Sequence, residues 1–220
     1  MDARTFVTSN TELIVVPFTP EIRLHLATEI TPIWQATEDE LAEQGLQPPF
    51  WAFAWPGGLG LARYLLDHPE TVRGKSVLDF ASGSGLVGIA ASLSGATQVV
   101  AADIDSFSLA AIRENAAVNN VSIDATQTDY LDCDVPGFDL IVAGDICYEK
   151  PLAKRVTDWL QKAATTGATV LLADPGRSYF DEINMTCIAR YDVPTSLELE
   201  DRATRSVGVW RVGNQSAPLF

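Results

Sequence analysis

Short apolar runs alternate with helix-compatible segments along most of the chain from Lys75 onward. The runs are rich in β-branched residues and comprise 76–81 (SVLDFA), 97–103 (TQVVAAD), 122–127 (SIDATQ), 138–144 (FDLIVAG) and 168–174 (ATVLLAD). Between most of them, apolar residues recur at helical spacing, in segments 85–95, 106–120 and 151–165. This alternation is typical of a parallel sheet covered by helices on both faces.

The alternation stops in the last part of the chain. Residues 189–200 (ARYDVPTSLELE) and 203–212 (ATRSVGVWRV) indicate two consecutive strands with only a short connection. Strands joined so closely pair antiparallel, because a parallel crossover needs about a dozen residues or more. We therefore predict an α/β fold with a doubly wound, mostly parallel, seven-stranded sheet. It is Rossmann-like and ends in a C-terminal antiparallel hairpin.

The first 55 residues are predicted to be a helical N-terminal extension of a single domain that spans 1–220, with the core in 56–220. After a short extended start, Thr19-Pro20 and Thr31-Pro32 each offer an N-cap residue followed by proline at the first helical position. Gly45 follows residues 34–44 and favours a helix end there.

Aromatic residues, proline and glycine dominate the stretch QPPFWAFAWPGG at 47–58, which indicates a loop. The following residues, 59–68, have apolar positions at helical spacing. A helix is therefore expected between this loop and the first strand of the sheet.

The composition suits one globular domain, since 47% of the 220 residues are hydrophobic. The three cysteines form no CxxC pair, and with only two histidines they support neither a disulfide framework nor a zinc site. The N-terminus lacks the apolar core of a signal peptide, and no apolar stretch approaches the ~18 residues of a membrane span. We expect a soluble, cytoplasmic protein without a bound metal.

The net charge is −14, from 15 Lys and Arg against 29 Asp and Glu. Such a surface repels nucleic-acid phosphates and attracts basic partners. On charge alone, plain solubility is the simpler explanation. We expect no nucleic-acid partner, no membrane partner and a monomeric protein.

A glycine-rich loop provides the first candidate chemistry. Gly83 and Gly85 directly follow the first parallel strand, where ligands of doubly wound sheets bind and where glycine lets the backbone approach them. Asp103 ends the next strand, and an acid there can accept hydrogen bonds from both hydroxyls of a ribose. A turn needed only for packing would use the same glycines. Because Gly88 completes a GxGxxG pattern, the spacing alone does not exclude a nucleotide-dependent oxidoreductase.

The stretch VLDFASGSG, followed by AADID, resembles motif I and the next acidic motif of the seven-strand S-adenosylmethionine methyltransferases. This resemblance implies S-adenosylmethionine as the cofactor, its methionine portion against the glycine loop and its ribose on Asp103. Asp129 would lie beside the adenine, although TDYLD at 128–132 also suits a polar turn. The predicted cofactor-binding residues are Trp55, Asp79, Gly83, Gly85, Asp103 and Asp129. For Trp55, packing of the N-terminal part against the sheet is an equal alternative.

Over residues 17–212 the chain resembles, more narrowly, the electron-transfer-flavoprotein β-subunit lysine methyltransferases. Four stretches in order carry this likeness, namely FTPEIRL, the segment from PPFWAFAWPGG to the glycine loop, GDICYEKPLAKRVTDWL and VLLADPGRSYF. In the larger family to which that group belongs, the fourth strand ends in Asp-x-x-Tyr, which here is Asp145 to Tyr148. The resemblance implies protein-lysine methylation, with the electron transfer flavoprotein β subunit as substrate and ribosomal proteins also open.

Asp145 and Tyr148 are therefore the candidate catalytic residues. Methyl transfer from a sulfonium is an in-line displacement by a neutral amine, and making a lysine of pKa ~10.4 neutral near pH 7.4 costs about 4 kcal/mol. A carboxylate favours the ammonium, so Asp145 is predicted to recognise the lysine and not to act as its base. Tyr148 would offer a ring face to the cation or wall the channel. Alternatively, Asp145 caps the following helix and Tyr148 packs beside it.

Arg177 is a candidate substrate-binding residue. It follows the fifth strand in DPGR, at the same rim as Asp145. Its guanidinium would hold a carboxylate of the protein substrate, or an internal acid such as Asp145, or simply tie down its loop.

Other functions stay open on the sequence alone. A small-molecule N-methyltransferase for nicotinamide-like amines predicts a closed pocket, whereas protein methylation predicts an open groove beside Asp145. A non-catalytic module that kept the cofactor fold is opposed only by the presence of the site residues. Methylation of DNA or RNA is disfavoured by the charge and by the absence of an NPPY-type signal.

Overall fold

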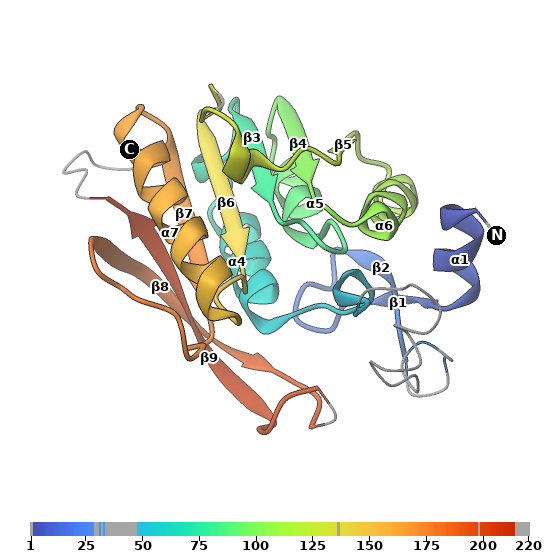
Figure 1. Cartoon of the computed structure of the whole chain (residues 1–220). Coiled ribbons are helices and arrows are strands. Elements are labelled where there is room, and N and C mark those ends of the chain that lie inside the picture. Colours follow the sequence, from blue (N-terminus) through green and yellow to red (C-terminus); the bar gives the residue numbers. More distant parts are fainter. Residues whose placement is uncertain are drawn as a thin grey trace.

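The computed structural model describes residues 2–28, 31, 33, 48–135, 137–197 and 199–213. Its centre is a seven-stranded sheet with strand order β5-β4-β3-β6-β7-β9-β8 (Figure 1). The strands are β3 (Ser76–Phe80), β4 (Gln98–Ala102), β5 (Asp124–Thr126), β6 (Leu140–Gly144), β7 (Thr169–Asp174), β8 (Met185–Pro194) and β9 (Thr204–Val212). β3 to β7 pair parallel, and β9 pairs antiparallel with β7 and β8. The predicted fold class, including the C-terminal hairpin, is confirmed.

Among the described residues, the helices around the sheet are α4 (Pro56–Asp67), α5 (Leu86–Leu93), α6 (Ser106–Val118) and α7 (Lys150–Thr165). α4 and α5 pack on one face through side chains such as Leu61, Leu65 and Ile89, while α7 packs on the other through Val156 and Leu160 (Figure 1). Burial on both faces explains why β6 and the middle of β7 are apolar and do not alternate.

The N-terminal part differs from the expected helical extension in its described residues. Helix α1 (Ala3–Ser9) is followed by an antiparallel hairpin of β1 (Glu12–Val15) and β2 (Arg23–Leu26). Thr19-Pro20 lies in the connection of this hairpin, where Thr19 N donates to Val16 O and Ile22 N donates to Thr19 O. The prediction of a helix start there is wrong, because a turn closed by these bonds uses the same Thr-Pro pair. Pro32 and residues 34–47, with the predicted helix end at Gly45, lie outside the described residues.

The loop before α4 contains a short 3-10 helix, η1 (Phe50–Ala52), and ends at Trp55, the N-cap of α4. Two further 3-10 turns are η2 (Pro69–Thr71) and η3 (Tyr130–Asp132). The start of α4 touches the end of β6 closely. A Cβ at Gly144 would lie 2.9 Å from Gly58 Cα, and a Cβ at Gly57 would lie 2.6 Å from Asp145 N. Only glycines permit this approach, which places the N-terminus of α4 at the residues that follow β6.

Candidate active site

The glycine loop forms a tight backbone turn between β3 and α5. Ala81, Gly83 and Gly85 all have positive φ, of 53°, 55° and 84°, a region that favours glycine. A Cβ at Gly85 would lie 3.3 Å from Ile112 Cα, so this glycine also serves packing against α6. At Gly83 the nearest atom to such a Cβ is Trp51 Cα, 3.9 Å away. The space around Gly83 leaves its backbone open to a ligand.

Asp79 holds this loop from inside the sheet. Its carboxyl is buried, and Oδ2 accepts hydrogen bonds from Ser82 Oγ at 2.5 Å and from Gly88 N at 2.8 Å. Burial raises the pKa of Asp79 to about 7 against these bonds, and the charge of Asp103 adds to the rise. The bonds show Asp79 joining the glycine loop to the first turn of α5.

Asp103 lies at the end of β4 and binds the same loop. Its Oδ2 accepts from Gly83 N at 2.8 Å and its Oδ1 from Asp105 N at 2.9 Å. Partial burial raises the pKa of Asp103, although these bonds oppose the rise. Asp129, after the neighbouring β5, caps η3 by accepting from Leu131 N at 3.0 Å. The structure thus brings Asp79, Asp103 and the glycines together, while the observed bond of Asp129 belongs to a polar turn.

The aromatic loop 50–55 lies over this edge. Trp51 is buried and stacks on Phe107 of α6, with ring centroids 6.4 Å apart. Trp55 donates from Nε1 to Phe50 O at 2.8 Å, and its ring meets those of Phe50 and Phe53. It is therefore the backbone of Trp51 that borders Gly83, while the cofactor contact assigned to Trp55 remains a prediction.

Asp145 is buried and in the left-handed region, with φ of 60°. Its Oδ2 accepts from Gly57 N at 2.9 Å, one of the first amides of α4, a helix 88 positions earlier in the chain. Helix α7 begins at Lys150 with Glu149 as its N-cap. The alternative that Asp145 caps the following helix is thus wrong, since the helix that it caps is α4. A strained backbone held by surrounding contacts is typical of functional sites.

Arg177 is the second partner of the Asp145 carboxylate. Its Nε donates to Asp145 Oδ1 at 2.6 Å and its Nη2 to Asp145 Oδ2 at 3.2 Å. Nη2 and Nη1 also donate to Glu200, at 2.6 Å to Oε1 and 3.2 Å to Oε2. Burial alone would lower the pKa of Arg177, but its bonds with the two acids raise it, so it stays charged. Of the roles considered for Arg177, pairing with internal acids is the one that the structure displays.

The pairing continues outward from Glu200. Arg205 binds Glu200 Oε2 at 2.9 Å and Asp201 Oδ1 at 2.6 Å through its Nη2. The result is an alternating charge ladder, which we define as Asp145, Arg177, Glu200, Arg205 and Asp201. Asp145 and Glu200 have side chains that are each 3% exposed, so each buried acid of the ladder is paired.

Asp174, at the end of β7 beside Asp145, is a further buried acid. Its Oδ1 accepts from Gly176 N and Arg177 N, both at 2.7 Å, and closes the turn that holds Arg177. Its Oδ2 is buried without a hydrogen-bond partner among the described residues. Burial, and next the charge of Asp145, raise the pKa of Asp174 to about 6.

Tyr148 lies near both the cofactor edge, marked by Asp103, and the acceptor side, marked by Asp145. Its ring is 5.3 Å from that of Phe50, and the residue is 45% exposed. Partial burial raises its pKa, and the carboxylates of Asp103, Glu149 and Asp145 raise it further. Tyr148 is therefore a neutral phenol with an accessible ring, placed within the fields of both Asp103 and Asp145.

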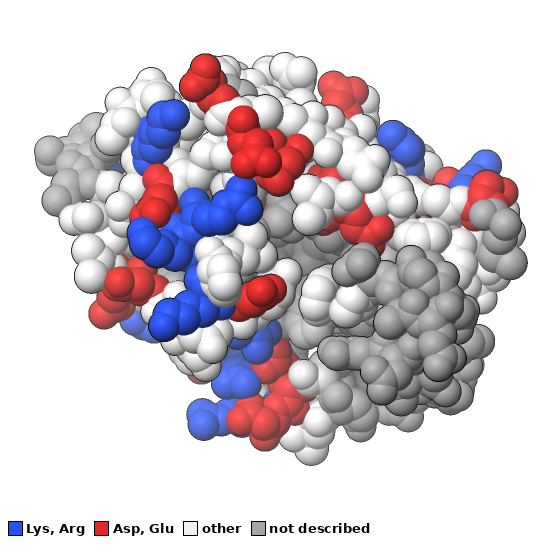
Figure 2. All heavy atoms as spheres, in the orientation of Figure 1, with Lys and Arg blue, Asp and Glu red and all other residues white. Residues whose placement is uncertain are grey.

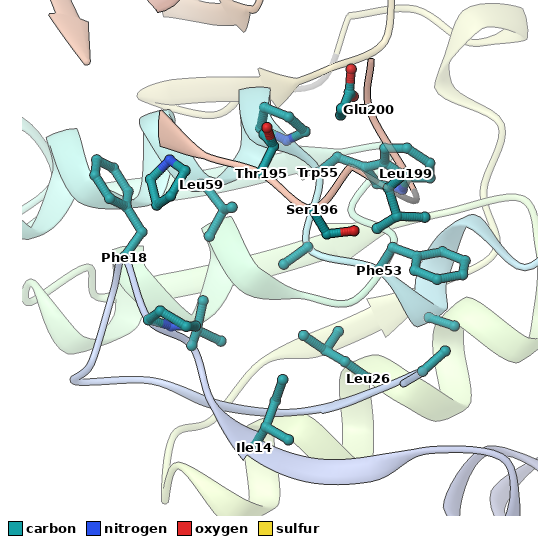
Figure 3. A pocket seen from close by; sticks show the side chains of 17 residues that line it. Ile14, Phe18, Leu26, Phe53, Trp55, Leu59, Thr195, Ser196, Leu199 and Glu200 are labelled. Atoms are coloured by element: carbon teal, nitrogen blue, oxygen red, sulfur yellow. The ribbon is translucent and has the colours of Figure 1, made fainter. Parts of the chain in front are cut away.

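An apolar pocket of about 340 Å³ adjoins the charge ladder (Figure 3). Side chains from the β1–β2 hairpin, the aromatic loop, the start of α4 and the β8–β9 connection line it; those labelled in Figure 3 include Ile14, Phe18, Leu26, Phe53, Trp55 and Leu199. Glu200 is the charged residue in the described lining and links the pocket to Arg177. Trp55 therefore faces this pocket.

Sequence reasoning missed Glu200, Gly57 and Phe50. Glu200 was placed in a strand, whereas it lies in the β8–β9 connection, after β8 ends at Pro194. No motif marks its pairing with an arginine 23 positions earlier. The glycine pair in the first turn of α4 was a visible signal for a close backbone approach, but not for its partner Asp145.

The surface charge is mixed on the face shown in Figure 2. Basic side chains gather over α7 between acidic ones. Within the described part of the chain, no cluster of His, Cys, Asp and Glu is arranged to hold a metal ion. Nor is any helix among those residues long and apolar enough to cross a membrane.

Comparison with known proteins finds relatives that are methyltransferases by name. The family model described as ribosomal protein L11 methyltransferase (PrmA) matches residues 64–173. The electron transfer flavoprotein beta subunit lysine methyltransferase of Danio rerio is 38% identical over 217 residues, covering 96% of this chain and 83% of the relative. The protein of the same name from Homo sapiens is 36% identical over 216 residues, covering 95% and 81%.

Solved structures share the fold. TrmN from Thermus thermophilus matches with a TM-score of 0.53 and 24% identity, over 70% of this chain and 48% of that one. The tRNA (uracil-54, C5)-methyltransferase of Pyrococcus abyssi, solved with S-adenosyl-L-homocysteine, matches with a TM-score of 0.51 and 19% identity, over 69% and 38%. At these identities the likeness concerns the fold alone.

Proposed function

Because this chain belongs to the family of electron transfer flavoprotein beta subunit lysine methyltransferases, we propose that it transfers methyl groups from S-adenosylmethionine to the Nζ of a lysine in a protein substrate. The observation that supports this most directly is the strained, buried Asp145 with a partly exposed Tyr148 three residues on. Both follow β6, at the same edge of the sheet as the glycine loop after β3.

The residues of that edge fit the cofactor. Gly83 presents an open backbone, and Asp103 is a partly exposed acid at the end of the second parallel strand, suited to a ribose. We propose that Gly83, Gly85 and Asp103 bind it directly, with Asp79 shaping the loop. Contacts by Trp55 and Asp129 belong to the same proposal. When bound, the cofactor supplies an electrophilic methyl group on a sulfonium.

Asp145 and Tyr148 recognise the substrate lysine and align its Nζ with the methyl group. The Nζ lone pair forms the new N–C bond as the C–S bond breaks, with its electron pair leaving on sulfur. Asp145 accepts a hydrogen bond from the amine and orients its lone pair. Tyr148 provides a ring face for the cationic centre. The proton of the incoming ammonium leaves to water.

The substrate that the relatives' names favour is the electron transfer flavoprotein β subunit. Ribosomal protein is a second candidate of the same class, because the ribosomal protein L11 methyltransferase of Pseudomonas syringae pv. tomato is 32% identical over 181 residues. The exposure of Tyr148 supports an acceptor site accessible to a protein side chain. We further propose a monomer acting in the cytoplasm, and expect the charge of −14 to favour Lys-bearing partners.

Labelling identifies the substrate. The purified protein is incubated with radiolabelled cofactor and an extract of cells that lack this enzyme, and labelled products are identified by mass spectrometry. The proposal expects methylated lysine in a protein, foremost the electron transfer flavoprotein β subunit. Label confined to small molecules would contradict protein methylation and support an amine N-methyltransferase.

A further inference from the structure

The charge ladder contains a feature that lysine recognition alone does not require. Arg177 grips Asp145 with two nitrogens and Glu200 with two, and its own side chain is only 20% exposed. We propose that Arg177 offsets the charge of the Asp145 carboxylate so that the target lysine beside it can lose its proton, and that Glu200 holds Arg177 in position for this. The inference rests on the proposed function and adds a positioning pair to it.

The Asp145 side chain is 3% exposed, and one of its acceptor directions has no donor among the described residues. A carboxylate offers about four acceptor directions, and Asp145 uses three of them, two on Oδ2 for Gly57 N and Arg177 Nη2 and one on Oδ1 for Arg177 Nε. One direction on Oδ1 remains. A neutral amine can donate one N–H there and keep its lone pair for the methyl group.

The charge of Arg177 resolves the energetic conflict at this position. An unpaired carboxylate stabilises an adjacent ammonium and thereby opposes the deprotonation that attack requires. A guanidinium bound to the same carboxylate contributes a potential of opposite sign at a comparable distance. Asp145 therefore keeps its directional hydrogen bond while most of its preference for the ammonium is removed.

Among the described groups around Asp145, Arg177 supplies the positive charge that offsets the carboxylate. From β7, Asp174 adds negative charge above its pKa of about 6. On the β6 side, burial raises the pKa of Cys147 to about 12 and also raises the pKa of Tyr148, so neither carries charge near neutrality. Glu149 adds negative charge further along the same loop. From α4 the group in contact is the uncharged Gly57 amide.

Glu200 fixes where the guanidinium lies. Its buried carboxylate binds Arg177 through Nη1 and Nη2, and it is itself bound by Arg205 Nε at 3.0 Å. The guanidinium of Arg177 is thus held along two adjacent edges, by Asp145 on Nε and Nη2 and by Glu200 on Nη1 and Nη2, which selects one geometry of the side chain. Glu200 also tempers the positive charge, so neutralising Glu200 and neutralising Arg177 must act on the lysine in opposite directions.

The test is the pH profile of kcat for methyl transfer to the protein substrate. Arg177→Gln removes the offsetting charge and is expected to move the rising limb at least about one pH unit toward alkaline, which means about tenfold less activity at pH 7.4. Arg177→Lys keeps the charge and is expected to restore the position of the limb at a lower rate. Glu200→Gln keeps an acceptor oxygen, and its limb is expected to move toward acid.

A matched control is Arg155→Gln. It removes an exposed arginine of α7 that pairs with Asp132, and it should leave the pH profile unchanged. Cofactor calorimetry checks that each variant is folded; should Arg177→Gln fail this check, the acid shift of Glu200→Gln decides. Wild-type turnover in the same assay tests the proposed function, whereas the displacement of the variants' profiles tests the inference. A profile of Arg177→Gln that superimposes on wild type at a reduced rate would overturn it, as would shifts of Arg177→Gln and Glu200→Gln in the same direction.

Discussion

Gly57 and Gly58 are neighbouring residues of α4 whose replacement by alanine should have opposite effects. A Cβ at Gly57 would lie 2.6 Å from Asp145 N, 2.8 Å from Ala173 O and 2.8 Å from Asp145 Cβ. Two of these atoms are backbone, so they cannot move aside cheaply. A Cβ at Gly58 meets only Leu86 Cδ2 at 3.9 Å and Val87 Cγ2 at 4.0 Å, which are ordinary contacts.

The magnitudes follow from two competing terms. Alanine in a helix gains about 0.5–1 kcal/mol over glycine, while overpacking costs about 1–3 kcal/mol. Gly57→Ala should therefore destabilise the protein by about 1–2 kcal/mol net, and Gly58→Ala should be neutral or stabilising by up to about 1 kcal/mol. For a protein of this size 1 kcal/mol corresponds to about 2–4 °C in Tm. Gly57→Ala is thus expected to lower Tm by about 2–8 °C.

Function should separate the two variants further. The clash at Gly57 falls on Asp145 itself and on the amide that binds its Oδ2. Since a displacement of about 1 Å at a reacting centre can reduce rates about 100-fold, Gly57→Ala should lose at least tenfold in kcat while Gly58→Ala keeps it. Thermal unfolding and methyl-transfer rates measure both effects. Equal stability and equal rates of the two variants would refute the close α4–β6 contact as the device that positions Asp145.

Two further predictions concern the cofactor edge. Asp103→Asn should weaken binding of S-adenosylmethionine about tenfold or more, measured by calorimetry, because it removes the charged acceptor proposed for the ribose; unchanged affinity would exclude that assignment. Asp79 has a folded-state pKa of about 7 against an ordinary value of 3.8, so the folded state binds the proton more tightly and the stability contributed by this group is lost as pH rises from about 4 to 7. Urea unfolding of wild type and Asp79→Asn at pH 5 and pH 8 should show the wild type losing more stability than the variant, by about 3 kcal/mol, because about two pH units separate pH 5 from a pKa of about 7. An identical pH dependence in both proteins would contradict a raised pKa at Asp79.

The strands of the sheet were predictable because buried strands consist mainly of contiguous apolar residues, which the sequence shows directly. β6 is apolar along its length and β7 is apolar between Thr169 and Asp174, and the glycine loop lies where a strand must turn into a helix. The hairpin at the C-terminus followed from the short connection alone. These are local or periodic signals, and each corresponds to one physical constraint on a contiguous segment.

The assembly of the acceptor site was not predictable in the same way. Asp145 caps a helix 88 positions earlier, and Arg177 binds an acid 23 positions later. Such pairings depend on which ends of strands and helices the tertiary fold brings together, so no spacing along the chain encodes them. Thr19-Pro20 shows the converse limit, because the same pair suits a helix start and a hairpin turn and only the β1–β2 pairing decides between them.

The carboxylate of Asp145 is proposed to receive a protein lysine beside a separately bound cofactor. The most direct measurement combines calorimetric binding of S-adenosylmethionine with methyl transfer to the electron transfer flavoprotein β subunit, in one preparation of Asp145→Asn. Cofactor affinity should stay within about threefold of wild type, and transfer should fall by at least about 100-fold. Wild-type rates of lysine methylation in the variant, with the cofactor bound normally, would contradict the proposed role of Asp145.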